Sequence, residues 1–230
     1  MKRTQVVRLG LVEYQEAKAL QERLVEARKR REIPDLLLLL RHPHVITLGR
    51  PGSRQYLRFP ESELNIPVVE AGRGGEVTYH GPGQLIAYPI LQLEEGERDL
   101  HRYLRNLEDV ALGLCAGYGL EATRVEGRTG AWIADQKIAA IGVRARAWIT
   151  YHGMAFNHSQ DLQGFDSIVP CGISDAGVTS LEHQLGRLVD EAELEDRFCR
   201  QFTKVFSREL QVMGTEQLED LLKAKIKADS

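Results

Sequence analysis

The segment Arg73–Pro89, RGGEVTYHGPGQLIAYP, places glycine-rich backbone directly before an apolar run, Leu85–Ile90, that is typical of a buried strand. Its glycines are Gly74, Gly75, Gly81 and Gly83. Glycine lacks a Cβ atom, so its backbone can adopt positive φ angles and approach a ligand closely. A hairpin with a glycine-rich turn accounts for this composition. The Gly-Pro dipeptide and the nearby Arg73, His80 and Gln84 instead favour a loop that faces a ligand.

Length and composition indicate a globular protein. The chain has 230 residues, 43% of them hydrophobic, and a formal net charge of -3. This charge argues against a general affinity for nucleic acid. The longest apolar run, Leu36–Leu40, is far shorter than the roughly 20 residues that span a bilayer, and Met1–Gly10 lacks the apolar region of a secretion signal. We expect a cytoplasmic protein that binds neither nucleic acid nor membranes.

The cysteines and histidines match no disulfide framework or zinc pattern. Cys115, Cys171 and Cys199 are an odd number of thiols at wide spacings, so we expect each to be free. Cys115 falls in a helical pattern and fits a small buried side chain. His42 and His44 lack the further ligands that zinc requires. We therefore expect no metal site.

Apolar periodicity predicts the elements of the first half of the chain. An amphipathic helix is expected over Tyr14–Arg31, and a second helix is expected from an N-cap at Asp99 to Gly117 or Gly119. Strands are expected at Leu36–Leu40, Val45–Leu48, Val68–Val69 and Leu85–Ile90. Because the first of these runs is entirely apolar, it should be buried on both faces.

The second half is predicted to begin with strands and to end with helices. The expected elements are a hairpin with arms Ala131–Ala134 and Ile138–Val143, a following strand that carries Arg144 and Arg146 and continues through Trp148 to Gly153, and helices over Asp190–Leu210 and Glu216–Lys227. Lys137 opens the second arm of the hairpin, where a lysine is usually solvated.

A proline and a glycine restrict the turn around Cys171, in the sequence Val169-Pro170-Cys171-Gly172. Thr179–Glu182 has the form of a capping box that begins a short helix. A helix N-terminus directed at Cys171 lowers the pKa of the thiol and favours the thiolate. By itself, the segment fits a structural cysteine better than a nucleophile.

Four segments together resemble one known family. They are RGGEVTYHGPGQLIAYP, GRTGAWIADQKIAAIGVR, YHGMAFN and VPCGISDAGVTSLEHQLG. Their order and spacing are similar to those of the octanoyltransferases of lipoate biosynthesis, the lipoate-protein ligase B type, from about residue 42 to residue 186. The resemblance implies an α+β fold like the catalytic domain of biotin and lipoate protein ligases, with a larger mixed sheet, a smaller sheet and packed helices. It implies one catalytic domain over residues 1–230, with a helical C-terminal segment over about 190–228.

The resemblance also implies an activity and its residues. Octanoyl would pass from octanoyl-acyl carrier protein to the target lysine of lipoyl domains, including those of 2-oxoacid dehydrogenase complexes and the glycine cleavage H protein, with no cofactor and no ATP. Cys171 would accept the acyl group, with Lys137 as its base. The implied substrate-binding residues are Arg73, Gly74, Gly75, Thr78, Tyr79, His80, Gly81, Gln84, Ala140, Ile141, Gly142, His152 and Gly153.

Two other functions are compatible with the same fold. An ATP-dependent lipoate or biotin ligase would hold an acyl-adenylate and need no cysteine, and a noncatalytic module would only bind carrier proteins or lipoyl domains. The presence of both Cys171 and Lys137 favours the transferase. His80 and His152 are the next candidates for the base, and backbone N–H groups near Gly142 or Gly172 are candidates for stabilising an oxyanion.

Overall fold

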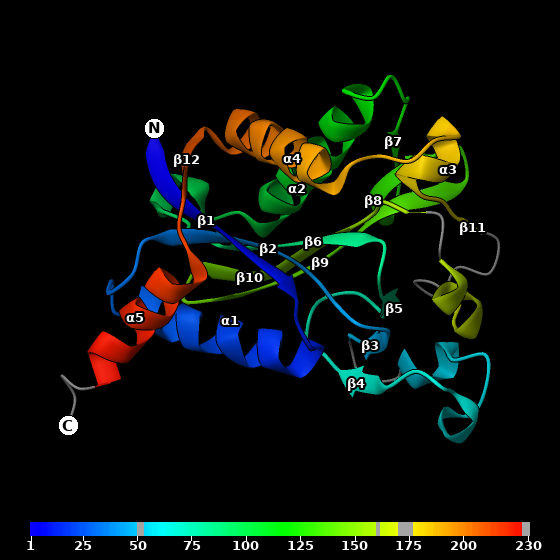
Figure 1. Ribbon diagram of the computed structural model, residues 1–230, viewed down its shortest axis with the longest axis horizontal. Helices are drawn as coiled ribbons and strands as arrows, with labels where there is room; N and C mark the ends of the chain where they lie inside the picture. Colours follow the sequence, from blue (N-terminus) through cyan, green and yellow to red (C-terminus); the bar gives the residue numbers. More distant parts are fainter. Residues whose placement is uncertain (50–52, 160–161, 170–176, 227–230) are drawn as a thin grey trace.

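The protein is built around one large mixed β-sheet and a second, small sheet (Figure 1). The computed structural model describes residues 1–49, 53–159, 162–169 and 177–226. Residues 224–226 are described as backbone only. Cys171 and Gly172 lie outside the described residues. The α+β fold predicted from the sequence, with a larger and a smaller sheet, is confirmed.

The large sheet contains strands from both the N-terminal and the C-terminal parts of the described chain. Its strands, in spatial order, are β12 (Arg208–Val212), β1 (Lys2–Leu11), β2 (Asp35–Arg41), β6 (Gln84–Ile90), β10 (Ile149–Asn157), β9 (Gln136–Arg146), β8 (Arg128–Ile133) and β7 (Thr123–Val125), and β11 (Gly177–Val178) pairs with β9. The strands β12, β1 and β2 run parallel, whereas β2, β6, β10, β9, β8 and β7 pair in antiparallel fashion. The small sheet has the order β4 (Val68–Glu70), β3 (Val45–Leu48), β5 (Val77–His80).

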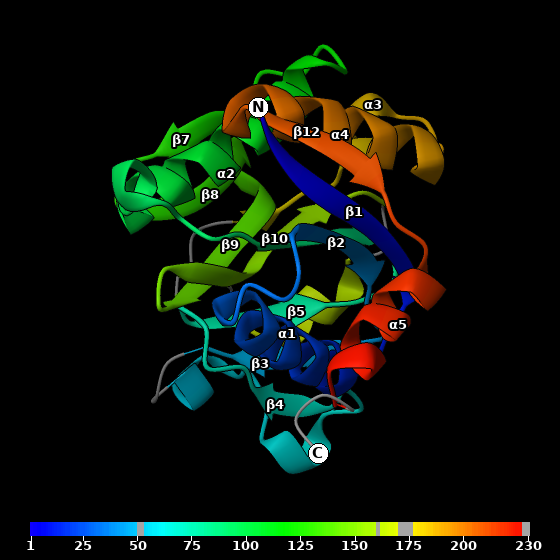
Figure 2. The ribbon, with the colours of Figure 1, turned by 90° about the vertical axis from the view of Figure 1, so that its left-hand side faces the viewer.

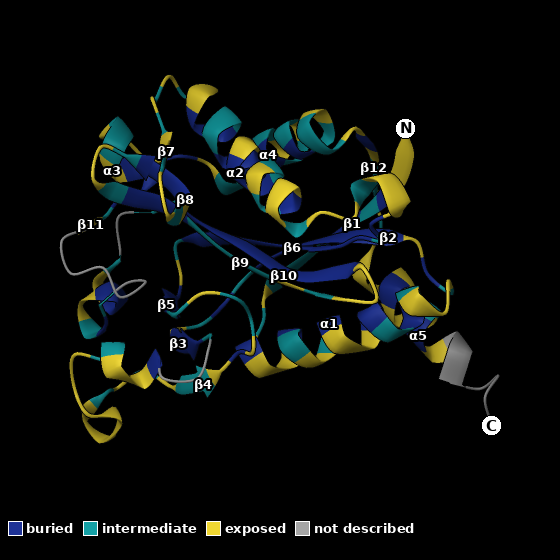
Figure 3. Ribbon diagram, turned by 180° about the vertical axis from the view of Figure 1, so that it is seen from behind, coloured by how far each residue is buried: buried dark blue, intermediate teal, exposed yellow. Residues whose placement is uncertain are grey.

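Helices cover both faces of the large sheet (Figures 2 and 3). The helices α2 (Leu100–Ala116) and α4 (Glu191–Phe206) lie on one face, and α1 (Tyr14–Lys29) and α5 (Thr215–Ile226) lie on the other. The remaining helices are α3 (Leu181–Leu185) and short 3-10 helices at Ser53–Tyr56, Glu61–Glu63, Glu95–Glu97 and Gln163–Ser167. None of the helices in the described ranges is long and apolar enough to cross a membrane.

The strand β2 shows why an uninterrupted apolar run forms the centre of this sheet. Leu37 and Leu39 belong to the hydrophobic cluster under α2 and α4, whereas Leu36, Leu38 and Leu40 belong to the cluster under α1. Alternate side chains of a strand point to opposite faces, so apolar side chains are needed at every position. The prediction of a strand buried on both faces is confirmed.

The first helices also form as expected. The helix α1 matches the predicted amphipathic segment, and α2 begins at Asp99, whose carboxylate accepts hydrogen bonds from the backbone N–H groups of His101 and Arg102. Cys115 of α2 is completely buried, and burial raises the pKa of its thiol to about 12. The expectation that Cys115 is a buried structural side chain agrees with this environment.

The glycine-rich segment does not form the alternative hairpin. Its strand β5 pairs with β3 in the small sheet, whereas β6 pairs with β2 and β10 in the large sheet. The residues between β5 and β6 therefore carry the chain from one sheet to the other. The sequence had favoured a loop that faces a ligand over a hairpin, and a segment that links two sheets is consistent with this interpretation.

Other expected boundaries were wrong. Arg144 and Arg146 belong to β9 rather than to a following strand, and a turn at Ala147 and Trp148 separates β9 from β10. Ser180, not Thr179, is the N-cap of α3 and accepts a hydrogen bond from the His183 backbone N–H.

Two strands at the ends of the chain were missed. The strand β1 was not expected, and β12 interrupts the C-terminal segment that was expected to be helical over residues 190–228. Both strands depend on pairing with each other, a contact between residues about two hundred positions apart that periodicity cannot reveal.

Candidate active site

A narrow cavity of about 50 Å³ lies where the glycine-rich loop and β5 meet β9 and β10 of the large sheet. The lining residues that the sequence had singled out are Arg73, Gly75, Thr78, His80, Lys137, Ala140, Ile141, Gly142, His152 and Gly153. Residues that the sequence analysis had not singled out for the site also line it, namely Tyr14, Glu76, Val77, Tyr88, Met154 and Ala155. As formed, the space has room for a few water molecules.

Lys137 is buried in the wall of this cavity. Only 5% of its surface is exposed, and its ammonium nitrogen lies 4.6 Å from the centroid of the Trp132 ring on the paired strand β8. An ammonium over an indole face is attracted by the ring quadrupole. The interpretation of Lys137 as an ordinary solvated lysine is wrong.

Arg73 fixes the glycine-rich loop to the small sheet. Its guanidinium donates hydrogen bonds to the carbonyl of Gly74 at 2.9 Å and to the carbonyl and hydroxyl oxygens of Thr47 at 3.0 and 2.8 Å. The loop also lies directly on β9, where the Gly74 N–H donates to the Val143 carbonyl at 3.2 Å. A Cβ atom at Gly142 would approach the Gly74 carbonyl oxygen to 2.9 Å, so this close contact requires glycine.

Four of the predicted binding residues do not line the cavity: Gly74, Tyr79, Gly81 and Gln84. The Tyr79 hydroxyl is hydrogen-bonded to His44 Nδ1 at 2.6 Å, and its ring packs against Phe165. A Cβ atom at Gly81 would lie 2.0 Å from the Tyr79 hydroxyl oxygen. These four residues are therefore outside the cavity lining, and Gly81 packs closely against Tyr79.

Three buried histidines lie in or next to the cavity: His80 and His152 line it, and the His42 ring lies 5.7 Å from that of His80. Burial lowers the pKa of His42 to about 4 and that of His152 to about 3, with the positive charge of Arg73 adding to the effect at His152. Burial, followed by the charges of His42 and Arg73, holds the pKa of His80 well below its usual range. Imidazoles with such low pKa values are neutral at physiological pH and weakly basic. His80 and His152 are therefore poor substitutes for Lys137 as a base.

The first of these histidines is a structural residue. His42 is hydrogen-bonded through Nδ1 to the Val12 carbonyl at 2.7 Å and through Nε2 to the Tyr88 hydroxyl at 2.8 Å. Within the described ranges, no three His, Cys, Asp or Glu side chains come together as metal ligands.

The Tyr14 hydroxyl and His152 Nδ1 in the cavity wall have no hydrogen-bond partner among the described residues, and their side chains are 3% and 2% exposed. His152 has a φ angle of 55°, and its backbone N–H donates to Gln21 Oε1 of α1 at 2.7 Å. Buried polar atoms are usually satisfied, so these atoms are available to a bound molecule or to water.

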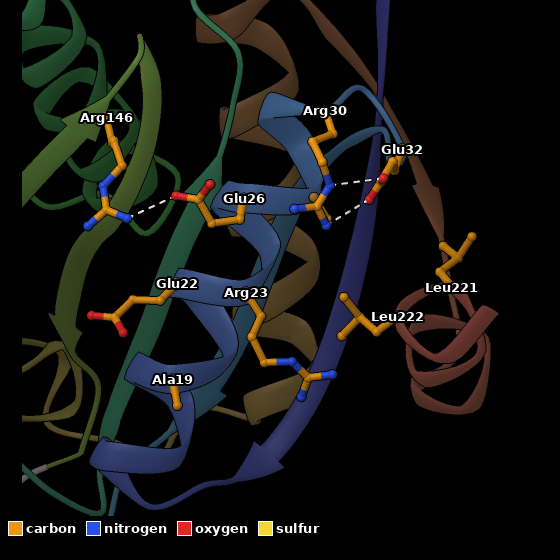
Figure 4. Close-up of a pocket in the computed structure, with 10 residues that line it drawn as sticks. Ala19, Glu22, Arg23, Glu26, Arg30, Glu32, Arg146, Leu221 and Leu222 are labelled. Atoms are coloured by element: carbon orange, nitrogen blue, oxygen red, sulfur yellow. Dashed lines mark hydrogen bonds and ion pairs between the residues drawn. The ribbon is translucent and has the colours of Figure 1, made fainter. Parts of the chain in front are cut away.

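A wider groove of about 570 Å³ lies between α1 and α5 but is a poorer candidate (Figure 4). Four of its charged side chains pair with one another, Arg146 with Glu26 at 2.9 Å and Arg30 with Glu32 at 2.9 Å. None of its lining residues within the described part of the chain is a cysteine, histidine or lysine. The cavity at Lys137 therefore remains the candidate active site.

The fold identifies the structural class. A solved lipoate-protein ligase A bound with ATP superposes with a TM-score of 0.75, 16% identity and coverage of 98% of this chain and 94% of that chain. The T. acidophilum protein Ta0514, a putative lipoate protein ligase with bound lipoic acid, gives 0.73, 14% identity and coverage of 98% and 95%. The chain therefore has the fold of the lipoate protein ligases.

Sequence comparison identifies the family. The model of the lipoyl protein ligase A/B catalytic domain matches residues 13–203. The Octanoyltransferase of Caldicellulosiruptor bescii is 45% identical over 220 residues, 94% of this chain and 96% of its own, and that of Rubrobacter xylanophilus is 47% identical over 205 residues, 85% and 90%. The chain belongs to the lipoyl protein ligase A/B catalytic domain family, and it is an acyltransferase.

Proposed function

We propose that this enzyme transfers an octanoyl group from octanoyl-acyl carrier protein to the target lysine of a lipoyl domain, through a thioester on Cys171. The observation that carries the proposal is the buried Lys137 side chain in the cavity beneath the glycine-rich loop. The names of the relatives at 43–47% identity supply the octanoyl group. The lipoyl domains would include those of 2-oxoacid dehydrogenase complexes and the glycine cleavage H protein.

Cys171 is the best candidate nucleophile among the cysteines. Burial raises the pKa of Cys115 to about 12 and that of Cys199 to about 11, and neither lines the cavity. A thiol with a raised pKa forms little thiolate, which is the reactive species. Cys171 stands in the segment that resembles the acyl-accepting segment of the family.

The first half-reaction exchanges one thioester for another. Lys137, in its neutral amine form, accepts the Cys171 proton, and the thiolate attacks the carbonyl carbon of the donor thioester. The new C–S bond forms, the donor C–S bond breaks, and the carrier thiol leaves with the proton. Two thioesters have nearly equal energies, so the acyl group stays activated without ATP.

The second half-reaction forms the amide. The amine of the target lysine attacks the enzyme thioester, the C–N bond forms, and the C–S bond to Cys171 breaks. The nitrogen loses one proton, and Cys171 recovers one. Backbone N–H groups of the Gly142 region are candidates for stabilising the oxyanion.

The length of the acyl chain contributes to binding. An octanoyl tail has about six methylenes, and burying each is worth about 0.8 kcal/mol, for a total of about 5 kcal/mol. Val77, Ile141, Met154 and Ala155 are the apolar residues of the cavity wall that would contact the tail.

An ATP-dependent ligase is the main alternative, because a structurally similar protein was solved with ATP. That similarity, at 16% identity, concerns the fold alone. The relatives at 43–47% identity carry the name Octanoyltransferase, which favours transfer from a thioester. A noncatalytic module does not explain a buried lysine in the cavity.

Intact-protein mass spectrometry tests the proposal. The purified chain is mixed with octanoyl-acyl carrier protein without ATP, and a lipoyl domain is added afterwards. We expect an octanoyl adduct on Cys171 that moves to the domain. Cys171→Ser should form no adduct that the domain can accept, whereas the matched control Cys199→Ser should behave like the wild type. Modification that needs free octanoate and ATP would instead establish a ligase.

A further inference from the structure

A chain of buried amides connects Asn157 to His80. Asn157 is the last residue of β10 and pairs with Gln84, the first residue of β6. The exposed fractions of Asn157, Gln84 and His80 are 3%, 2% and 6%. Buried amides in such a chain have a single arrangement that satisfies their donors and acceptors.

The hydrogen bonds of Asn157 determine which way its amide points. One amide atom lies 2.9 Å from the carbonyl oxygen of Thr179 and 3.3 Å from that of Lys137. A carbonyl oxygen only accepts hydrogen bonds, so this atom is the nitrogen Nδ2. Oδ1 of Asn157 therefore faces Gln84.

The same reasoning determines the orientation of Gln84. Its nitrogen Nε2 lies 3.0 Å from Asn157 Oδ1 and 3.2 Å from the Tyr79 carbonyl oxygen, both of which accept. Its oxygen Oε1 consequently faces His80, 3.2 Å from Nδ1. Because Oε1 can only accept, Nδ1 of His80 must carry a hydrogen.

His80 is thus held in one tautomer. A neutral imidazole carries a single ring hydrogen, so Nε2 has a free lone pair. Gln84 occupies the Nδ1 edge of the ring, whereas His80 itself lines the cavity together with Lys137. A hydrogen-bond acceptor in the wall of this cavity needs a donor. An octanoyl tail has no donor, but the attacking amine has N–H groups.

We propose that Asn157 and Gln84 are positioning residues that hold His80 as the Nδ1–H tautomer, and that His80 Nε2 accepts a hydrogen bond from the amine of the target lysine. This inference rests on the proposed function. This hydrogen bond would hold the amine in the cavity, and the proton balance of the amide-forming step is unchanged. Asn157 Nδ2 also donates a hydrogen bond to the Lys137 carbonyl oxygen, so the same amide is linked to the backbone of Lys137 and, through Gln84, to His80.

The tautomer can be observed without an activity assay. We expect long-range ¹H–¹⁵N correlation spectra of histidine-labelled protein to show His80 as Nδ1–H, with the signal assigned by its loss in His80→Asn. An Nε2–H tautomer in the wild type would overturn the inference. In Asn157→Leu we expect a mixture of tautomers; a folded Asn157→Leu that keeps only Nδ1–H would remove Asn157 from the assignment.

The pH dependence of each half-reaction tests the role of Nε2. The titratable or charged groups that contact His80 or line the cavity with it are Tyr14, His42, Arg73, Glu76, Tyr88, Lys137 and His152. In Gln84→Glu, a carboxylate next to Nδ1 favours the imidazolium and raises the pKa of His80. Its Nε2 then gains a proton at higher pH and stops accepting a hydrogen bond.

We therefore expect the acid limb of the second half-reaction in Gln84→Glu to move to higher pH by about one unit or more, with the limb for adduct formation moved less. The matched control is Gln5→Glu on β1, whose Gln5 side chain donates to Gln211. An unshifted second half-reaction in Gln84→Glu would overturn the inference. If the wild type forms no adduct at all, the proposed function fails, and the tautomer spectrum still reports on His80 by itself.

Discussion

At the scale of single residues, the site is a set of polar side chains withdrawn from water. Lys137, His80, His152 and Tyr14 are each at least 94% buried, yet they line a common cavity. Burial removes the histidine charges and raises the pKa of Tyr14 to about 12. Among the residues that line the cavity in the described part of the chain, the lysine and arginine side chains are Lys137 and Arg73.

Substitution of Lys137 by arginine should abolish most transfer without unfolding the protein. A guanidinium stays protonated and cannot accept the thiol proton, so we expect the rate of adduct formation to fall by about 100-fold or more. This rate is measured by quenching the reaction at successive times and quantifying the octanoyl adduct by mass spectrometry. Lys204→Arg, on the exposed face of α4, is the control. A Lys137→Arg enzyme with the normal rate would reassign the base.

Acid should destabilise the protein through His42. Its pKa is about 4 in the folded state, against an ordinary value of 6.5, so the unfolded chain binds the proton first as the pH falls. Stability is therefore lost between pH 6.5 and 4, by about 3 kcal/mol for this residue. Urea unfolding at pH 7 and pH 4.5 should show a smaller loss in His42→Gln than in the wild type. An equal loss in both would exclude His42 as the cause, and His101→Gln on the exposed surface of α2 serves as the control.

Some residues of the site could be predicted from the sequence. The resemblance named Arg73, His80, Lys137 and His152, and all four line the cavity. Tyr14 was found only as a member of an apolar stripe, because helical periodicity does not distinguish a core residue from one facing a cavity. Asn157 was not selected, since its importance depends on partners far apart in sequence.

At the scale of elements, the turn between β9 and β10 fixes the register of the two strands that carry the site. Arg146 pairs with Ile149, so the loop has two residues, Ala147 and Trp148. Their φ angles are 49° and 61°, as a type I′ turn requires, although neither is glycine or asparagine. The register that follows places Gly142 opposite Gly153.

Replacing Ala147 by asparagine should stabilise the protein. Asparagine tolerates positive φ better than alanine, so we expect a gain of about 0.5–1 kcal/mol. Thermal unfolding checks this prediction. Ala19→Asn, at an exposed position of α1, is a matched control and should lower stability by a few tenths of a kcal/mol because asparagine is a weaker helix former than alanine. A lower melting temperature in Ala147→Asn would contradict the expectation.

The accuracy of the predicted elements follows from how local their signals are. α1, β2 and α2 have strong patterns of their own and were predicted correctly. β1 and β12 were missed because their sequences, KRTQVVRLGL and RELQV, mix exposed and buried positions without a regular period of two. Both are stabilised by parallel pairing, which gives no signature in a short window of sequence.

At the scale of the whole molecule, buried charges connect distant parts of the large sheet. Asp35 of β2 pairs with Arg208 of β12 and with Arg28 of α1, the latter at 2.8 Å. The Arg208 side chain is 2% exposed, and Asp35 Oδ1 also accepts the backbone N–H of Gln92 at 2.9 Å. This cluster crosses β1, which lies between β12 and β2.

Loss of Arg208 should destabilise the fold strongly. Arg208→Met leaves the buried Asp35 with one cation fewer, and we expect a loss of about 3 kcal/mol in the free energy of unfolding. Arg3→Met is the matched control, because Arg3 is 72% exposed and lies 3.8 Å from Glu209. Equal urea midpoints for Arg208→Met and Arg3→Met would show that the buried pair contributes little.

The position of β12 also has a consequence for synthesis of the protein on the ribosome. β1 is made about two hundred residues before β12, so its outer edge over Lys2–Val6 is covered only when residues 208–212 emerge. Until then the nascent chain exposes the unpaired amide and carbonyl groups of Lys2–Val6 on this edge. A chain interrupted before Arg208 keeps that edge open and offers it to another copy, so premature termination should yield aggregates rather than a smaller enzyme.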